Sequence, residues 1–340
     1  MARKQKAKWI GIDVGGANIK AASTSHPAVS LDFPLWKQPQ LLAKTLKKLF
    51  REMGGCENIA VTMTGELADC FQTKREGVSF ISKACADAAG DAKVHFYSVN
   101  GEFLTLAKAC KKWDEVAASN WHALASWSAR HAQQEGPGLV IDIGSTTTDI
   151  IPFAKRKVCC KAWNDIDRLV TGELVYTGVE RSSVAGIAPE LPLHGSLVPV
   201  MNELFATSLD AYLLLGEIPE NEKNTATADG RGATKALAHA RLARMVGGDS
   251  TTIARKETLQ MASYIADRQA EFIATALRKI RSHHPQEIHF SGHGKFLARR
   301  ALKLVSLSGP YESEYFGSDL GPRCAPAVAL MELAQEYFQS

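Results

Sequence analysis

The sequence predicts an α/β protein of two domains around a central cleft. Three observations support this fold class. A strand-and-turn motif near the start of the chain recurs near its middle, strand-like and helix-like apolar segments alternate, and 340 residues exceed what one hydrophobic core usually supports. Hydrophobic residues make up 45% of the chain, which is enough to fill two cores.

The repeated motif spans residues 11–20 in its first copy and residues 140–149 in its second. In each copy an aspartate, Asp13 or Asp142, follows an apolar run, and a glycine comes two residues later. Each copy is typical of a buried strand that ends in a tight turn, where successive amide N–H groups bind an anion. One such turn is weak evidence, but two copies about one domain length apart indicate a shared phosphate site. The alternative is two hairpins without a ligand.

An aspartate beside a phosphate is repelled unless a divalent cation lies between them. Magnesium accepts one or two carboxylates together with phosphate oxygens. We therefore expect Asp13 and Asp142 to hold Mg²⁺ directly or through water. The residues expected to contact the phosphate oxygens are Gly15, Gly16, Asn18, Lys20, Gly144, Ser145, Thr146 and Thr147. Asp149 either joins this site or ends the second strand of its hairpin.

The first half of the chain alternates helix and strand signals. Leucines at helical spacing predict a helix over residues 42–53, and an apolar run predicts a strand over residues 58–64. Residues 103–110 and 117–131 are further helical candidates. The Gly136-Pro137-Gly138 break follows, so we place the first domain at residues 1–136 and the second at residues 137–324.

The second half contains a long helical pattern over residues 256–281 and then a strand over residues 287–291. This strand leads through a glycine turn into a helix over residues 296–305, which is a suitable place for an anion or a nucleotide edge. The alternative is a connection whose glycines permit close packing. A final helix over residues 325–338 is expected to return and brace the first domain. The residues of the turn proposed to face the cleft are Gly292, Gly294 and Lys295.

The sequence Thr-Gly-Glu-Leu occurs twice, at residues 64–67 and 171–174. Thr64 and Gly65 at a strand end expose a hydroxyl and a bare backbone to the cleft, and Glu66 or Glu173 is then able to accept a proton or bind the metal. The competing interpretation places each glutamate in the first turn of a helix, where the helix dipole favours it.

The polar loop over residues 224–234 is a further candidate. We expect Asp229 and Arg231 to close over a substrate, with Arg231 pairing to a phosphate or carboxylate. The alternative is a disordered linker.

Composition excludes several classes of protein. The net charge is +4, and the basic residues are dispersed apart from a short N-terminal arm, so nucleic-acid binding is not expected. Neither a membrane span nor a signal peptide is evident, which predicts a cytoplasmic protein. The seven cysteines lack C-x-x-C spacing, which argues against a disulfide framework or a zinc site. The sequence is compatible with a monomer and with a homo-oligomer.

The paired turns resemble those of the actin, sugar-kinase and Hsp70 superfamily, which implies two duplicated RNase H-like domains. In that superfamily the turn over residues 291–295 resembles the adenosine-binding turn, but here His293 separates the two glycines. Residues 61–77, 141–152, 171–181 and 227–230 together resemble the tetrahydromethanopterin-linked C1-transfer pathway protein family. That family is a hydantoinase/oxoprolinase-like branch of the superfamily.

The resemblance implies a transferase of methanofuran biosynthesis. It would join an aminomethylfuran-methyl diphosphate to a γ-glutamyl-tyramine or γ-glutamyl-tyrosine phenol and release pyrophosphate, with Mg²⁺ and without a requirement for ATP. In this interpretation Asp13, Asp142 and Glu66 are the catalytic residues, and Glu66 is the base for the phenol proton. Two other classes stay open: an ATP-dependent small-molecule kinase or amide-ring hydrolase, and a nucleotide-dependent scaffold.

Overall fold

The computed structural model describes residues 7–280, 284–307, 311–313 and 322–339. The first sheet has six strands in the order β3-β2-β1-β4-β5-β6. Strand β1 pairs antiparallel with β2 and parallel with β4, so the first turn motif is a hairpin at the centre of this sheet. The strands are β1 (Ala7–Val14), β2 (Asn18–Ser23), β3 (Val29–Asp32), β4 (Cys56–Met63), β5 (Lys93–Tyr97) and β6 (Phe103–Leu104).

The second sheet repeats this plan. Its order is β10-β8-β7-β13-β14, with β9 pairing to β8, and β7 again has an antiparallel hairpin partner on one side and a parallel strand on the other. The duplication inferred from the two turn motifs is therefore visible in the strand pairing. The strands are β7 (Gly138–Ile143), β8 (Thr148–Ala154), β9 (Lys157–Val158), β10 (Leu174–Val175), β13 (Glu287–Gly292) and β14 (Tyr311–Ser313).

Helices cover the first sheet and fill its core. Leucines at three- and four-residue spacing place one apolar stripe of α1 against the sheet, where Leu42, Leu46 and Leu49 are buried. Helix α2 begins at Thr73, whose hydroxyl accepts the N–H of Glu76, an N-cap interaction. The helices of this region are α1 (Leu42–Glu52), α2 (Lys74–Ala88), α3 (Leu106–Lys111) and α4 (Trp113–Val116).

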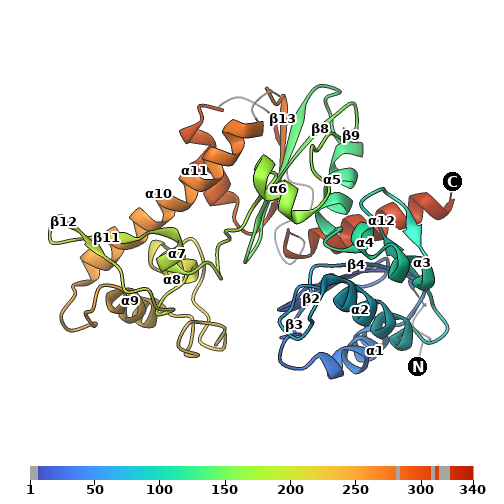
Figure 1. The fold of residues 1–340 in the computed structure, drawn as a ribbon, viewed down its shortest axis with the longest axis horizontal. Helices are drawn as coiled ribbons and strands as arrows, with labels where there is room; N and C mark the ends of the chain where they lie inside the picture. The colour runs from blue at the N-terminus through green and yellow to red at the C-terminus, as the bar shows by residue number, and fades with distance from the viewer. Residues whose placement is uncertain (1–6, 281–283, 308–310, 314–321, 340) are drawn as a thin grey trace.

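Helices α5 (Asn120–Arg130) and α12 (Ala325–Gln339) pack on each other, and α12 also contacts β1, β2 and β4. Trp127 of α5 donates its indole N–H to Glu332 of α12. Buried residues from both sheets, such as Trp9 and Val140, join these helices in one apolar cluster. The C-terminal helix therefore ties the two halves of the chain together (Figure 1).

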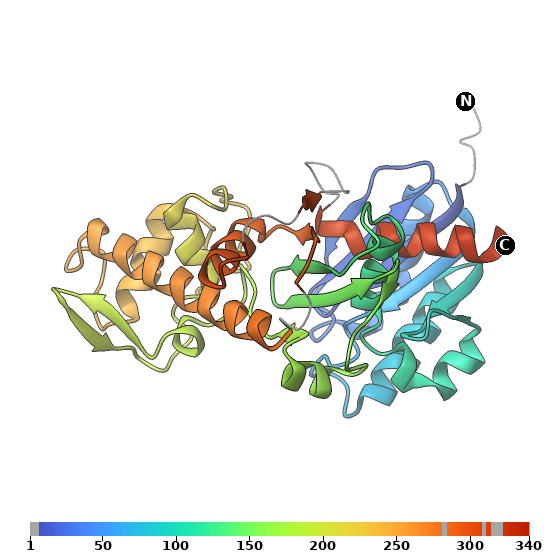
Figure 2. The same ribbon diagram turned by 90° about the horizontal axis from the view of Figure 1, so that it is seen from above.

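The second half also carries a long excursion between β10 and β13. Together with the outer part of α10 it forms the end of the molecule that lies away from the first sheet (Figures 1 and 2). Arg241, a fully buried residue of α9, is ion-paired to Asp210 of α8 and anchors this region. The elements of the excursion are α7 (Val184–Ile187), β11 (Glu190–Leu193), β12 (Ser196–Pro199), α8 (Ser208–Leu215), α9 (Lys235–Arg244) and α10 (Arg255–Ile280). Helix α6 (Asp165–Thr171) precedes β10, and α11 (Lys295–Leu304) follows β13.

The predicted elements agree with the observed ones apart from their ends and one segment. Phe103 and Leu104, expected in a helix, form strand β6 with β5, and the helix begins at Leu106. Both side chains pack on aromatic or aliphatic neighbours, which outweighs the local helical pattern. Among the described residues, every helix is too short or too polar to cross a membrane.

Replacing Gly11 with alanine is expected to destabilise the protein by about 1–3 kcal/mol, the usual cost of overpacking. A Cβ atom at Gly11 would lie 2.2 Å from the carbonyl oxygen of Ala327 and 2.9 Å from Cβ of Met331, because α12 packs directly on the backbone of β1. Urea unfolding measures the change. Gly186→Ala is the control, since a Cβ there meets no atom within 4 Å. Equal stability of the two variants would contradict this packing.

Candidate active site

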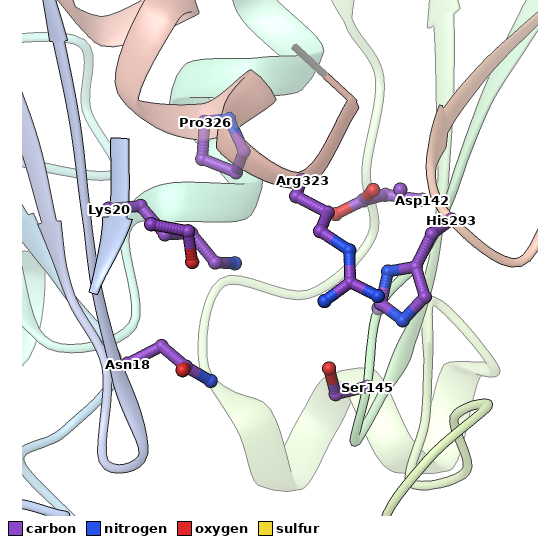
Figure 3. Close-up of a pocket in the computed structure, with 10 residues that line it drawn as sticks. Asn18, Lys20, Asp142, Ser145, His293, Arg323 and Pro326 are labelled. Carbon is purple, nitrogen blue, oxygen red and sulfur yellow. The ribbon is translucent and has the colours of Figure 1, made fainter. Parts of the chain in front are cut away.

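The two hairpin turns lie on opposite sides of a pocket between the sheets. Figure 3 shows Asn18 and Lys20 on one side and Ser145 and His293 on the other, with Arg323 reaching between them. The pocket thus draws on both halves of the chain and on the segment before α12. Its lining residues are Asn18, Lys20, Ser30, Asp142, Gly144, Ser145, Gly292, His293, Arg323 and Pro326.

The two turns have the same backbone hydrogen bond. The N–H of Gly15 donates to the carbonyl of Asn18 at 2.9 Å, and the N–H of Gly144 donates to Thr147 at 3.0 Å. A Cβ atom on Gly15 would lie 2.8 Å from the oxygen of Asn18, so the closure of the first turn requires glycine there. At Gly16 the same atom would meet nothing within 4 Å, which leaves room for a ligand beside that backbone.

Asp13 is buried and Asp142 is partly buried, and the two aspartates share one electrostatic neighbourhood. Asp13 is 2% exposed, and its Oδ2 lies 3.9 Å from Nζ of Lys20. Burial raises the pKa of Asp13, and Lys20 opposes this shift. The pKa of Asp142 is raised to about 6. Burial and the charges of Asp149 and Asp13 raise it, and the charge of Lys20 opposes them. Lys20 and both aspartates therefore act on each other across the pocket.

The carboxylates of Asp13 and Asp142 are oxygen ligands of the kind that Mg²⁺ binds. Asp13 Oδ1 is buried and has no hydrogen-bond partner among the described residues. Burying such an oxygen costs free energy unless a bound ligand or metal ion interacts with it. Among these residues, no group of three or more histidine, cysteine and acidic side chains is arranged to hold a metal. Two carboxylates with the other positions left to phosphate and water fit Mg²⁺ and do not fit a closed zinc site.

Asp149 and Glu173, like Asp13, are not among the residues that line this pocket, although the charge of Asp149 acts on Asp13 and Asp142. Asp149 Oδ1 accepts a hydrogen bond from Arg168 at 2.6 Å, and Arg168 also stacks over the ring of Trp121. The carboxylate of Glu173 accepts the N–H groups of Lys161 at 2.6 Å and Ala162 at 3.1 Å. Both acids serve internal contacts of the second half of the chain, because a buried carboxylate needs donors close by.

The segment Thr64–Glu66 adjoins the first turn. The N–H groups of Thr64 and Gly65 both donate to the carbonyl of Val14, and a Cβ on Gly65 would lie 3.1 Å from the backbone of Gly15. Glu66 is 1% exposed, and its Oε2 is buried without a hydrogen-bond partner among the described residues. Burial raises the pKa of Glu66 to about 7, which is suitable for a general base near neutral pH.

The glycine turn after β13 packs tightly on β7. A Cβ on Gly292, whose φ is +74°, would lie 2.2 Å from the carbonyl oxygen of Ile143, and a Cβ on Gly294 would lie 2.4 Å from Cγ2 of the same residue. The close-packing alternative therefore accounts for both glycines, although Gly292 also lines the pocket. Nζ of Lys295 lies 5.2 Å from the ring centroid of Phe290, a cation–π contact.

A charged cluster on the pocket wall was not predicted from the sequence. Glu180 accepts hydrogen bonds from Ser145 at 3.0 Å and from Arg323 at 2.9 Å, and Nε2 of His293 lies 3.1 Å away. Burial would raise the pKa of Glu180, but these partners outweigh it and lower the pKa to about 2. The cluster thus presents an imidazole and a guanidinium to the pocket. Their separation in sequence explains why no local motif indicated them.

The loop over residues 224–234 forms neither a disordered linker nor a wall of this pocket. Asp229 accepts a hydrogen bond from Arg241 at 3.0 Å and from the N–H of Arg231 at 3.1 Å. The hydroxyl of Thr227 donates to the carbonyl of Arg231. Asp229 therefore balances the buried guanidinium of Arg241, and the side chain of Arg231 is exposed away from the lining residues.

Comparisons with known proteins support the fold and the family. The chain is 31% identical over 335 residues to a (4-{4-[2-(gamma-L-glutamylamino)ethyl]phenoxymethyl}furan-2-yl)methanamine synthase of Methanocaldococcus jannaschii, covering 97% of this chain and 98% of the relative. A protein of the same name from Methanococcus vannielii is 26% identical over 187 residues, which is 54% of this chain and 84% of the relative.

Solved structures resemble the chain in fold. A nucleotide-free acetone carboxylase structure matches with a TM-score of 0.57 at 9% identity, covering 96% of this chain and 70% of that one. A chain of a PilM–PilN type IV pilus biogenesis complex matches with a TM-score of 0.50 at 12% identity, covering 96% and 98%. Together with the two sheets of like strand pairing, these matches confirm the predicted α/β fold with two similar halves.

The model of the hydantoinase/oxoprolinase family matches residues 57–335. This match and the full-length relative confirm the resemblance inferred from the sequence motifs. The chain belongs to the hydantoinase/oxoprolinase family and is similar over nearly its whole length to the Methanocaldococcus jannaschii synthase.

Proposed function

We propose that the protein is a Mg²⁺-dependent transferase of methanofuran biosynthesis. It condenses an aminomethylfuran-methyl diphosphate with the phenol of a γ-glutamyl-tyramine or γ-glutamyl-tyrosine and releases pyrophosphate. The observation that carries this proposal is the buried, unpartnered oxygen of Asp13 beside Lys20, which lines the pocket together with Asp142. Such a carboxylate pair is suited to a metal-bound polyphosphate. The names of the relatives describe a phenoxymethyl-furan methanamine as the product, which supports this choice of substrates.

The reaction replaces one carbon–oxygen bond with another. The phenol oxygen forms a bond to the furfuryl carbon, the bond from that carbon to the diphosphate oxygen breaks, and the phenol proton passes to a base. Because the furan oxygen can share positive charge at this carbon, the barrier falls chiefly when the departing diphosphate is stabilised. Mg²⁺, held by Asp13 and Asp142, would offset the charge that develops on the leaving oxygens.

The chain's own residues orient and neutralise the diphosphate. The amides of the two turns are placed to donate to its oxygens, as in other anion-binding turns. Lys20 lies on one side of the pocket and Arg323 reaches in from the other, so positive charge is available on both sides of the group. An Arg323 donor not used by Glu180 can reach a phosphate oxygen, since a guanidinium has five N–H groups.

Glu66 is the proposed acceptor of the phenol proton. A phenol is a poor nucleophile when protonated, so a base beside the first turn would raise the rate of attack. Burial keeps the pKa of Glu66 near 7, between its usual value and that of the phenol. The carboxylate is then ionised in a large share of molecules at neutral pH and can take the proton as the ether bond forms.

The reaction itself tests the proposal. The purified protein is mixed with the furan diphosphate, Mg²⁺ and γ-glutamyl-tyramine, and pyrophosphate and the ether product are measured in equal amounts. Substituting γ-glutamyl-tyrosine tests the choice of acceptor. Parallel samples contain ATP and Mg²⁺ in place of the diphosphate. Turnover of ATP to ADP without ether formation would overturn the proposal in favour of a kinase or an ATP-dependent hydrolase.

A further inference from the structure

An ion pair joins the two halves of the chain beside the buried Glu66. Nζ of Lys74, at the first position of α2, lies 2.7 Å from Oδ2 of Asp165, at the first position of α6. Helix α2 covers the first sheet, and α6 belongs to the second half of the chain (Figure 1). The pair is about one-quarter exposed and is therefore screened less than a surface salt bridge.

The backbone of Glu66 packs on the start of α2, the helix that carries Lys74. A Cβ atom on Gly77, in the first turn of α2, would lie 2.2 Å from the carbonyl oxygen of Glu66, so the start of α2 rests directly on the Glu66 backbone. The charged groups that act on the Glu66 carboxylate are Lys74, Asp165 and Asp13. Lys74 favours its ionised form, and the two aspartates oppose it. Its Oε2 nevertheless has no hydrogen-bond partner among the described residues.

We propose that Lys74 and Asp165 are positioning residues for Glu66. Asp165 draws the ammonium group of Lys74 into a bridge between α2 and α6, which keeps that cation near Glu66 without pairing to it. Glu66 is therefore left with an open oxygen that can take a proton. A direct Lys74–Glu66 pair would hold the carboxylate permanently ionised and occupied. This inference rests on the proposed role of Glu66 as the base.

The two members of the bridge have opposite effects on Glu66, and this opposition provides the test. Asp165→Asn removes a negative charge and releases Lys74, so the pKa of Glu66 should fall. Lys74→Met removes the positive charge, so that pKa should rise. An opposite charge within a few ångströms shifts a carboxyl group by about one pH unit or more. A bridge whose charges lie too far from the Glu66 carboxylate to act on it would lose stability in both variants without shifting this pKa.

The measurement follows the titration of isotope-labelled glutamate side chains by NMR, with the Glu66 signal identified by its loss in Glu66→Gln. The controls are Asp167→Asn and Lys83→Met, which remove the same charges from exposed positions on the same two helices. We expect a fall of about one unit in Asp165→Asn, a rise of about one unit in Lys74→Met, and no change in the controls. Shifts of the same sign, or none, would overturn the inference.

This titration needs no substrate, so its outcome is independent of the proposed reaction. If the protein forms the ether, the pH profile of kcat gives a second readout. Its acid limb should move to lower pH in Asp165→Asn and to higher pH in Lys74→Met, while KM for the diphosphate stays unchanged. If KM changes and the acid limb of the pH profile does not move, the bridge acts on domain closure and does not control Glu66. If no ether forms, the NMR titration alone decides whether Lys74 and Asp165 control the pKa of Glu66.

Discussion

Asp142→Asn is expected to abolish the release of pyrophosphate, with a loss in kcat of at least about a hundredfold, the range seen when one electrostatic stabiliser of a transition state is removed. Asparagine keeps the size of the side chain and its place at the end of β7. It removes a negative charge that lines the pocket and interacts with Lys20 and Asp13. Any magnesium held there would lose one of its two carboxylates.

The assay is pyrophosphate release under saturating substrates, repeated over a range of Mg²⁺ concentrations. We expect excess Mg²⁺ to restore little of the activity, because the lost group acts on the bound metal. Asp267→Asn is the control, since Asp267 is an exposed aspartate on α10 that pairs with Arg300 far from the pocket. Retained activity in Asp142→Asn would remove the metal assignment.

Glu66→Gln is expected to lower kcat by about 10²- to 10⁴-fold, the usual contribution of a general base. The wild-type rate should rise with pH through about 7, because the ionised carboxylate is the active form and burial holds its pKa there. This acid limb should be absent in the variant, and KM for the diphosphate should change little. A variant with wild-type kcat and an unchanged limb would show that another group takes the proton.

The same residue affects stability. Its pKa is raised from 4.5 to about 7 in the folded protein, so the folded state binds more protons than the unfolded state between these pH values. The free energy of unfolding contributed by Glu66 therefore falls as pH rises from about 4.5 to about 7. Glu66→Gln should remove this part of the pH dependence, which urea unfolding at several pH values measures.

The hairpins were predictable because their signal is local. Asp13 and Asp142 each follow an apolar strand and precede a glycine, so a stretch of about ten residues specifies strand, turn and strand without reference to the rest of the chain. The repetition of the motif then indicated duplication, and the strand order agrees. Helix α12 was predicted equally well, because its apolar stripe is continuous.

The charged cluster on the pocket wall was not predictable in this way. Glu180, His293 and Arg323 meet only in the folded chain, and each looks like an isolated surface residue in the sequence. The same limit explains Asp149 and Glu173, whose acidity suggested a role in the cleft. Their partners are a buried arginine and two backbone N–H groups that no spacing rule places beside them.

The glycines after β13 show a second limit. A glycine in a strand-to-helix turn indicates either a ligand or a close backbone neighbour, and the sequence does not distinguish the two. The structure places Ile143 where the missing Cβ atoms would be, so packing on β7 is sufficient to require both residues. Asp229 is a similar case, because the buried guanidinium that it balances lies twelve residues further along.

The central claim is that the two acid-bearing hairpins grip a metal-bound diphosphate. Calorimetric titration of the wild-type protein with pyrophosphate, in the presence and absence of Mg²⁺, tests it most directly. The account predicts binding that requires Mg²⁺ and is lost in Asp13→Asn and in Asp142→Asn. Pyrophosphate binding that is equally tight without Mg²⁺, or undiminished in both variants, would contradict it.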